Sequence, residues 1–120
     1  MTRRTVSETA AAVKEELARR GVHLFAEIDH AQAAREVNQE LRETRVLLLG
    51  NPAAGTPLMQ QNESVALALP LKVLITESET GTRMAYQPLR DQAPAFGLSP
   101  ELPILGKLDA FMESLLAAVE

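Results

Sequence analysis

Residues 45–59, RVLLLGNPAAGTPLM, contain the stretch that comes closest to a known catalytic motif. An apolar run ends in Gly50, and Gly55 and Thr56 follow at nearly the spacing of a nucleotide-binding phosphate loop. Such a loop holds phosphates with successive backbone N–H groups and with a lysine that follows its last glycine. Here Thr56 follows Gly55 directly, and Pro52 has no N–H to contribute. The pattern therefore argues against a phosphate-loop hydrolase.

A weaker binding function remains open for the same loop. It leaves an apolar strand and enters a helix, which we expect to begin at Thr56 and Pro57. A helix N-terminus carries unpaired N–H groups and a partial positive charge, and glycines let a ligand approach the backbone. We therefore take Asn51, Gly55 and Thr56 as a candidate site for a small ligand or anion. The alternative is an ordinary turn in which Thr56 only caps the helix.

Three other residues are candidates for the same site. Lys72 lies at the start of a predicted strand and would supply the cation that the loop lacks. Asp29 and His30 are adjacent, and a carboxylate beside an imidazole stabilises its protonated form, as in an acid–base pair. The alternatives are a solvent-facing lysine and an aspartate that caps a helix. The spacing of His23 and His30 follows no metal-ligand pattern, and the sequence indicates neither a metal nor another cofactor.

The composition restricts the class of protein. The 120 residues are 46% hydrophobic and 23% charged, which predicts a single globular domain over residues 1–120. A net charge of −4, three Phe and one Tyr argue against nucleic-acid binding, which usually needs a basic surface and often stacking aromatics. The sequence has no cysteine, no run of ~18 apolar residues and no secretory signal, so we expect a cytoplasmic protein that does not bind a membrane.

Hydrophobic periodicity predicts the elements that position these residues, in the order α-β-α-β-α-β-β-α. We expect helices at 7–20 with Ser7 as N-cap, at 30–41, within 57–68 and from Ile104 to Val119, and strands at 22–28, 46–49, 71–76 and 82–87. The proline-rich residues 88–103 are expected to be irregular.

The strand pattern also predicts how the sheet is built. The even-numbered apolar residues of strand 22–28 should share one buried face, and the unbroken apolar run 46–49 indicates a central strand buried on both faces. The strand–helix–strand portion favours a parallel pair joined by a crossover, whereas the last two strands should form an antiparallel hairpin. We therefore expect an α+β fold with a mixed sheet of about four strands and helices packed on it.

The string LGNPAAGTPLM, followed by ALALPLKVLI, resembles the bacterial and archaeal domain-of-unknown-function 302 family. Members show F-G-N-P-x-x-G-T-x-L-M, then A-L-D-L-P-L-K/R before a strand. Upstream they show a glycine–aromatic strand and an I-D-H-A segment, which correspond here to residues 21–25 and 28–31. The match covers about residues 5–87. Leu49 stands where an aromatic residue is usual, and Ala68 stands where an aspartate is usual.

The resemblance implies a compact α+β domain that is often a dimer, and it implies no settled activity. A first strand is usual in the family, and residues 1–6 leave room here for a short one or none. Our leading hypothesis is a non-catalytic, homodimeric module that binds a small ligand or anion at residues 50–56. The alternatives are an assembly protein without a ligand, which dimerises through the last helix or the hairpin edge, and an enzyme that uses Asp29 and His30.

Overall fold

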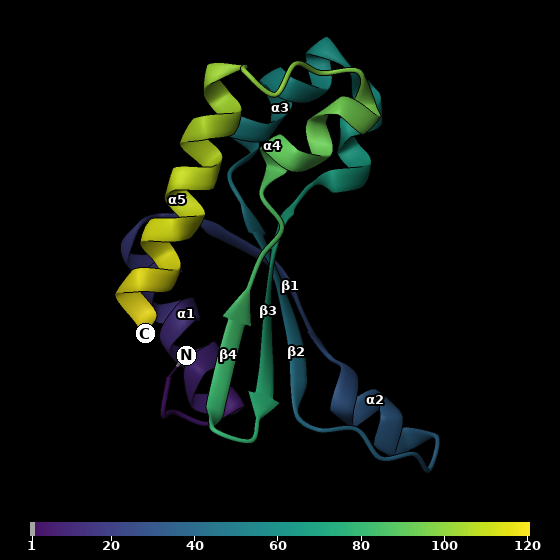
Figure 1. The fold of residues 1–120 in the computed structure, drawn as a ribbon, viewed down its shortest axis with the longest axis vertical. Coiled ribbons are helices and arrows are strands. Elements are labelled where there is room, and N and C mark those ends of the chain that lie inside the picture. The colour runs from purple at the N-terminus through teal and green to yellow at the C-terminus, as the bar shows by residue number, and fades with distance from the viewer. Residues whose placement is uncertain (1) are drawn as a thin grey trace.

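The computed structural model describes residues 2–120. The elements along the chain are α1 (Val6–Arg19), β1 (His23–Asp29), α2 (His30–Glu36), β2 (Thr44–Gly50), α3 (Pro52–Gln61), the 3₁₀ helix η1 (Glu63–Ala68), β3 (Leu71–Ser78), β4 (Gly81–Ala85), α4 (Leu89–Gln92), the 3₁₀ helix η2 (Ala93–Phe96) and α5 (Pro103–Val119). The predicted order of the main elements is confirmed. In Figure 1, α3, η1, α4 and η2 form a lobe at one end of the sheet, and α2 projects from the other end.

The sheet has the order β1-β2-β3-β4, and every neighbouring pair is antiparallel. The α+β class and the four strands are confirmed, as is the β3–β4 hairpin, but the predicted parallel crossover is wrong. The reason is the length of α2. Its seven residues span about 10 Å at ~1.5 Å per residue, whereas β1 spans about 23 Å at ~3.3 Å per residue. The chain therefore turns back beside β1 instead of returning to the end where β1 began.

The second helix stops at Glu36, five residues before its predicted end. Asn38 adopts φ 61°, a left-handed conformation that reverses the chain. Val37 and Leu41, which should have formed the apolar stripe of a longer helix, are 63% and 47% exposed. We call residues 30–43 the arm, because α2 and the segment after it project beyond the sheet (Figure 1).

A β-bulge changes which residues of β1 are buried. Leu24 pairs with Leu49 and Ala26 with Leu48, so Phe25 is an extra residue without a partner in β2. Opposed residues lie on the same face of a sheet, so the bulge places Leu24 and Ala26 on opposite faces. The prediction that the even-numbered residues of this strand share one buried face is therefore wrong.

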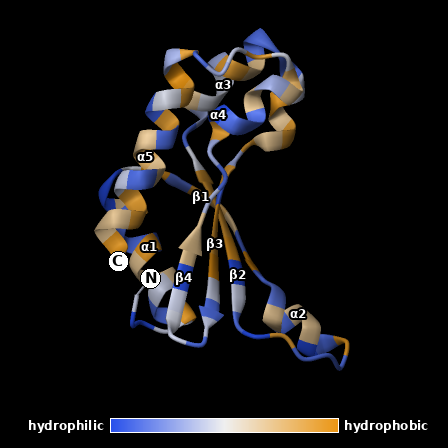
Figure 2. Ribbon diagram, in the orientation of Figure 1, coloured by the Kyte–Doolittle hydropathy of each residue, from blue (hydrophilic) through white to orange (hydrophobic). Residues whose placement is uncertain are grey.

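Helices α1 and α5 cover one face of the sheet and bury the core between them and the strands. The core includes Val13 and Leu17 of α1, Leu47, Leu49, Val73 and Ile75 of the sheet, and Leu105, Met112 and Leu115 of α5. The opposite face, which we call the open face, carries Ala26, Ile28, Val46, Leu48, Leu74 and Ala85. Val46 and Leu48 remain partly exposed there, so a single chain does not bury β2 on both faces as predicted. Figure 2 shows hydrophobic segments along the central strands as well as on α5.

Several local features differ from the sequence-based expectation. The N-cap of α1 is Thr5, whose hydroxyl accepts from the Glu8 N–H in a capping box, and not Ser7. In contrast, the first strand, expected to be short or absent, agrees with the prediction, because it is reduced to one bridge between Thr2 and Thr82. The proline-rich segment forms α4 and η2 and contributes Leu89, Ala93 and Leu98 to the core. None of the helices in the described part of the chain is both long and apolar enough to cross a membrane.

Candidate functional site

The segment of residues 50–56, which we call the glycine loop, contains less loop than the sequence suggested. Strand β2 ends at Gly50, Asn51 is the N-cap, and α3 begins at Pro52. The predicted start at Thr56 and Pro57 is therefore wrong, and both residues lie inside the helix. The reason is that Asn51-Pro52 is itself a strong start signal, because asparagine caps well and proline suits the first helical position.

The N–H groups at the start of α3 already have acceptors. The Asn51 side-chain Oδ1 accepts from the Ala53 N–H at 3.0 Å. The Asn51 backbone carbonyl accepts from Ala54 at 2.9 Å and Gly55 at 3.0 Å, and Pro52 has no N–H. An anion at this helix end would have to compete with these bonds. The geometry therefore supports an anion site less well than the sequence did.

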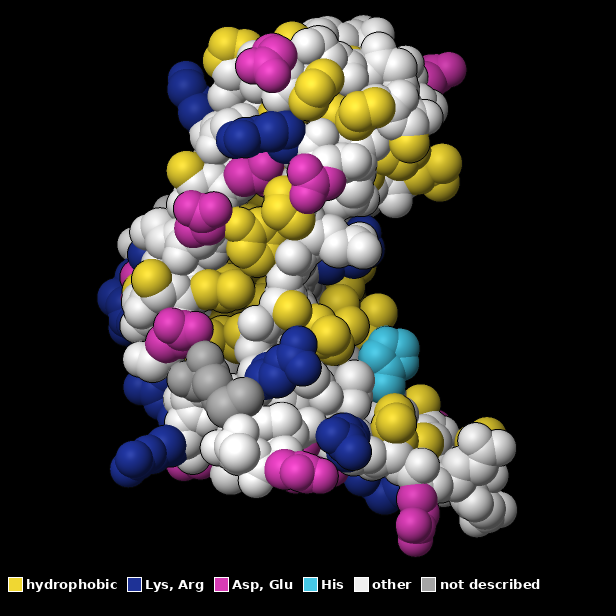
Figure 3. All heavy atoms as spheres, viewed as in Figure 1, with side chains coloured by type: hydrophobic (Ala, Val, Ile, Leu, Met, Phe, Trp, Pro, Cys, Tyr) yellow, Lys and Arg dark blue, Asp and Glu magenta, His cyan; other side chains and the backbone are white. Residues whose placement is uncertain are grey.

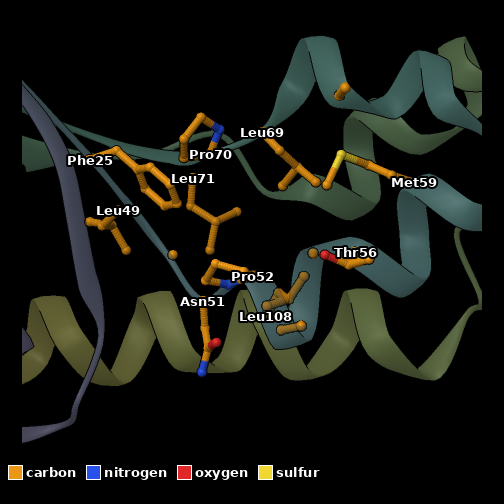
Figure 4. Close-up of a pocket in the computed structure, with 14 residues that line it drawn as sticks. Phe25, Leu49, Asn51, Pro52, Thr56, Met59, Leu69, Pro70, Leu71 and Leu108 are labelled. Atoms are coloured by element: carbon orange, nitrogen blue, oxygen red, sulfur yellow. The ribbon is translucent and has the colours of Figure 1, made fainter.

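Beside this loop lies a cavity of about 300 Å³, which we call the loop pocket. Its lining comprises Phe25, Leu49, Gly50, Asn51, Pro52, Ala54, Gly55, Thr56, Met59, Ala66, Leu69, Pro70, Leu71 and Leu108. The structure thus brings the three loop candidates, Asn51, Gly55 and Thr56, to one cavity. In Figure 4 the Asn51 amide points away from Leu69 and Met59, whereas Thr56 lies on the side of α3 that borders the cavity. The lining is otherwise almost entirely apolar, which suits an apolar ligand better than an inorganic ion.

Gly55 keeps part of this pocket open. It lies within α3, and its φ is not among the positive values that favour glycine. A Cβ at this position would meet the Leu69 Cδ1 at 3.6 Å and the Met59 Cε at 3.9 Å, which are ordinary contacts. Glycine inside a helix costs ~1 kcal/mol relative to alanine. The backbone does not require a glycine here, so its structural consequence is the space left beneath Leu69 and Met59.

Asp29 and His30 do not belong to the loop pocket. Asp29 pairs with Arg45 at the start of β2, whereas the pocket lies where β2 ends at Gly50. Five residues of strand separate the two places, about 17 Å at ~3.3 Å per residue. The Asp29 Oδ1 accepts from the Gln32 N–H at 2.9 Å and caps α2, as the alternative interpretation predicted. Within residues 2–120, no hydrogen bond joins Asp29 to His30, and no group of three or more acidic or histidine side chains could hold a metal ion.

An ion-pair network lies next to Asp29. The Glu27 carboxylate accepts from the Lys14 Nζ and the Arg45 Nη1, each at 2.8 Å, and the Arg45 Nε lies 3.7 Å from Asp29. The hydrogen bond from Lys14, and then that from Arg45, hold the pKa of Glu27 below its usual 4.5. The network joins α1 to β1 and β2, so its role is structural.

Lys72 lines a second cavity, of about 340 Å³, which we call the sheet pocket. This pocket lies between the open face and the lobe, and its lining comprises Val46, Ala68, Leu71, Lys72, Leu74, Ala85, Tyr86, Gln87 and Gln92. Burial, and then the nearby Glu113 carboxylate, raise the pKa of Tyr86, so its phenol stays protonated. Lys72 is therefore not the cation of the glycine loop. The six predicted site residues lie in three places. Asn51, Gly55 and Thr56 line the loop pocket, Lys72 lines the sheet pocket, and Asp29 and His30 lie at the start of α2.

One residue that was not among the predicted candidates, Asp109, fixes α4, the helix that contributes Gln92 to the lining of the sheet pocket. Asp109 is 6% exposed, and its Oδ1 accepts from the Leu89 N–H at 2.7 Å and its Oδ2 from the Arg90 N–H at 3.2 Å. Asp109 lies on α5 and thus caps the N-terminus of α4, whose own N-cap residue makes no side-chain cap. The sequence contains a signal for this contact. Asp109 stands between Leu105 and Met112 at the spacing of the apolar stripe, and a carboxylate buried there must be paired.

The fold and these cavities define a small α+β domain with a four-stranded antiparallel sheet, one face covered by two helices and the other open. The model of the family "Domain of unknown function DUF302" matches residues 1–119. The chain belongs to this family, as its motifs indicated. The crystal structure of an uncharacterized conserved DUF302 protein from Bacillus stearothermophilus has a TM-score of 0.88 over 98% of this chain and 92% of that one, at 16% identity, and shows the same fold.

Curated relatives match part of the chain. A protein named fluoride-specific ion channel FluC 1 from Brucella suis is 34% identical over 79 residues, which are 66% of this chain and 31% of that protein. The protein of the same name from Brucella abortus is also 34% identical over 79 residues, 29% of its length. The chain therefore spans about a third of the length of these relatives.

Proposed function

We propose that this protein is a non-catalytic binding module whose loop pocket takes a small, largely apolar molecule. The observation that carries the proposal is a cavity of about 300 Å³ next to the glycine loop, lined by apolar side chains from the sheet, α3 and α5. Its size is at the lower end of the ~300–1,000 Å³ typical of small-molecule sites. The helix glycine at position 55, which keeps the cavity open at a cost in helix stability, supports the same proposal.

The polar groups of the pocket define the ligand further. The Thr56 hydroxyl can donate one hydrogen bond and accept others. The N–H groups of the first turn of α3 are occupied. We therefore expect a neutral molecule with one hydrogen-bonding group. Apart from polar backbone at its rim, the pocket offers little to an inorganic ion.

A titration followed by NMR tests this proposal. Benzyl alcohol serves as the probe, because it combines an apolar ring with one hydroxyl. We expect shifts at Gly55, Thr56 and the Met59 methyl group, and about fivefold weaker binding to Thr56→Val, which removes one hydrogen bond of ~1 kcal/mol. Thr76→Val, which makes the same change on the open face, is the control. Shifts elsewhere, or the same affinity for both variants, would refute the assignment.

Ions are the necessary comparison in the same experiment. The names of the Brucella relatives make sodium fluoride a required probe, and sodium phosphate tests the anion hypothesis for residues 50–56. Because Asn51 occupies the N–H groups of α3, we expect neither ion to shift the Ala53 to Gly55 amide resonances. A saturating shift of those amides by either ion would replace the apolar ligand with an anion.

We further propose that the module is a homodimer in the cytoplasm. Within residues 2–120, the exposed large hydrophobic side chains are Phe25, Ile28, Val37, Leu41 and Leu67. The first four lie on β1 and the arm, and none lies on α5 or the hairpin, where the sequence analysis had placed the dimer surface. Figure 3 shows hydrophobic side chains gathered in the hollow between the lobe and the arm, which fits a second copy packed against this side.

Light scattering tests the homodimer. We expect twice the 13.1 kDa mass of one chain for the wild type. We expect the single-chain mass for Val37→Asp, because a carboxylate would be buried in the interface. Leu67→Asp is the control, since Leu67 is 81% exposed on the lobe. A dimer that also binds no benzyl alcohol would favour the alternative of an assembly protein without a ligand.

A further inference from the structure

The sheet pocket has the composition of a binding site in its own right. Its floor is the open face of the sheet, where Val46, Leu74 and Ala85 lie side by side in the register of β2, β3 and β4. Its wall comes from the lobe, through Ala68 of η1 and Gln92 of α4. With about 340 Å³, it is as large as the loop pocket. Of the residues that the structure describes, the two cavities share only Leu71.

The charge of this cavity is unbalanced. Among the described residues that line it, Lys72 is the single charged one, and none is acidic. The Lys72 Nζ donates to the Pro70 carbonyl at 3.3 Å, and in the described part of the chain no carboxylate lies within 4.0 Å of it. An ammonium group has three donors, so two remain for a ligand. The site is thus apolar over most of its surface and positively charged at one point.

The remaining polar side chains of the lining, Tyr86, Gln87 and Gln92, are uncharged. The Gln92 Nε2 donates to the Gln87 carbonyl at 3.2 Å, which ties the Gln92 side chain of the wall to the segment after β4. Its amide oxygen and the Gln87 side chain can take part in further hydrogen bonds. Asp109 fixes α4, the helix that carries Gln92. The wall of the cavity is therefore built before any ligand arrives.

From these observations we infer that the sheet pocket binds a small monocarboxylic acid with an apolar body. The carboxylate pairs with Lys72, and the body lies on Val46, Leu74 and Ala85. A single lysine matches a single negative charge. A phosphate group usually needs a second cation or a set of backbone N–H groups, and the nearby α4 N-terminus is already occupied by Asp109. The inference is independent of the loop pocket.

Titration of sodium hexanoate into ¹⁵N-labelled protein tests the inference. We expect saturating shifts of the amides of Lys72, Leu74 and Ala85. Lys72→Met keeps the apolar stem and removes the charge, so hexanoate should bind about tenfold more weakly to it. Arg83→Met is the matched control, because Arg83 is an exposed cation on the same face of the sheet that does not line the cavity. Its affinity should stay within about twofold of the wild type, since separate exposed charges are screened by salt.

Two further measurements make the result decisive. The uncharged 1-hexanol should bind about tenfold more weakly than hexanoate, because it lacks the charge that pairs with Lys72. Ala68→Asp, which places a carboxylate in the lining, should remove hexanoate binding. The site is refuted by equal losses in Lys72→Met and Arg83→Met, or by the absence of shifts up to the solubility of the acid. Shifts centred on Thr56 and Met59 would assign the acid to the loop pocket and also refute it.

Discussion

Asp109 is the residue whose replacement we expect to destabilise the fold most clearly. Its carboxylate accepts from the Leu89 N–H at 2.7 Å and from the Arg90 N–H at 3.2 Å. Leu89 is 1% exposed, so no solvent replaces its partner, and loss of this charge-assisted bond costs ~2 kcal/mol. The Arg90 bond is partly exposed and contributes about 1 kcal/mol. Asp109→Ala should therefore lower the free energy of unfolding by about 3 kcal/mol, and the melting temperature by roughly 10 °C at this chain length.

Urea and thermal unfolding of a small set of variants measure this effect. Asp109→Asn retains one acceptor oxygen for Leu89, so we expect a smaller loss of about 1–1.5 kcal/mol. Asp91→Ala removes an exposed carboxylate from α4 itself and should change stability by less than ~0.5 kcal/mol. The reasoning fails if Asp109→Ala and Asp91→Ala unfold at the same urea concentration with unchanged slopes.

Three smaller effects follow from other local contacts. Thr5→Ala should cost ~1 kcal/mol because it removes the cap of α1, whereas Ser7→Ala should be nearly neutral in urea unfolding. The lowered pKa of Glu27 adds stability above its unfolded value of 4.5 that is lost as pH falls through the folded pKa. Glu27→Gln should thus be about 1 kcal/mol less stable than the wild type near pH 7, and a difference that does not shrink by about pH 3 would count against the ion pairs. Gly97→Ala should lower the melting temperature more than Gly21→Ala does. Both glycines have φ near 70°, so both substitutions strain the backbone. Of the two, only a Cβ at Gly97 would come within 3.3 Å of another side chain, the amide of Asn62.

Hydrophobic periodicity was sufficient to predict the element order, the hairpin and α5. These features depend on spacing within one segment, and spacing is visible in the sequence. The direction of β2 relative to β1 depends instead on where α2 stops. Its end is set by the left-handed turn at Asn38, and asparagine is only one of several residues that tolerate such a turn. The apolar pattern of Val37 and Leu41 continued past that point, so the predicted helix was too long.

The candidate site was also predicted only in part, because spacing within one segment is visible in the sequence and the pairing of strands is not. Asn51, Gly55 and Thr56 lie within one helical turn and a half, so any strand–helix junction would bring them together. Whether Lys72 or Asp29 joined them depended on the pairing of strands. Antiparallel pairing with β2 places Asp29 opposite Arg45, at the end remote from the loop. Lys72 pairs with Leu48 on the open face and therefore faces the other cavity.

The two positions that depart from the family pattern each line a cavity in this fold. Leu49 lines the loop pocket, and Ala68 lines the sheet pocket together with Lys72. An aromatic residue at position 49 would add bulk to the lining of the loop pocket, whereas an aspartate at position 68 would place a carboxylate in the same lining as the lysine. Because alanine stands there, position 68 offers no carboxylate to pair with the lysine, which the proposed carboxylate site requires. Both departures thus change the lining of a cavity and leave the hydrogen bonding of the sheet intact.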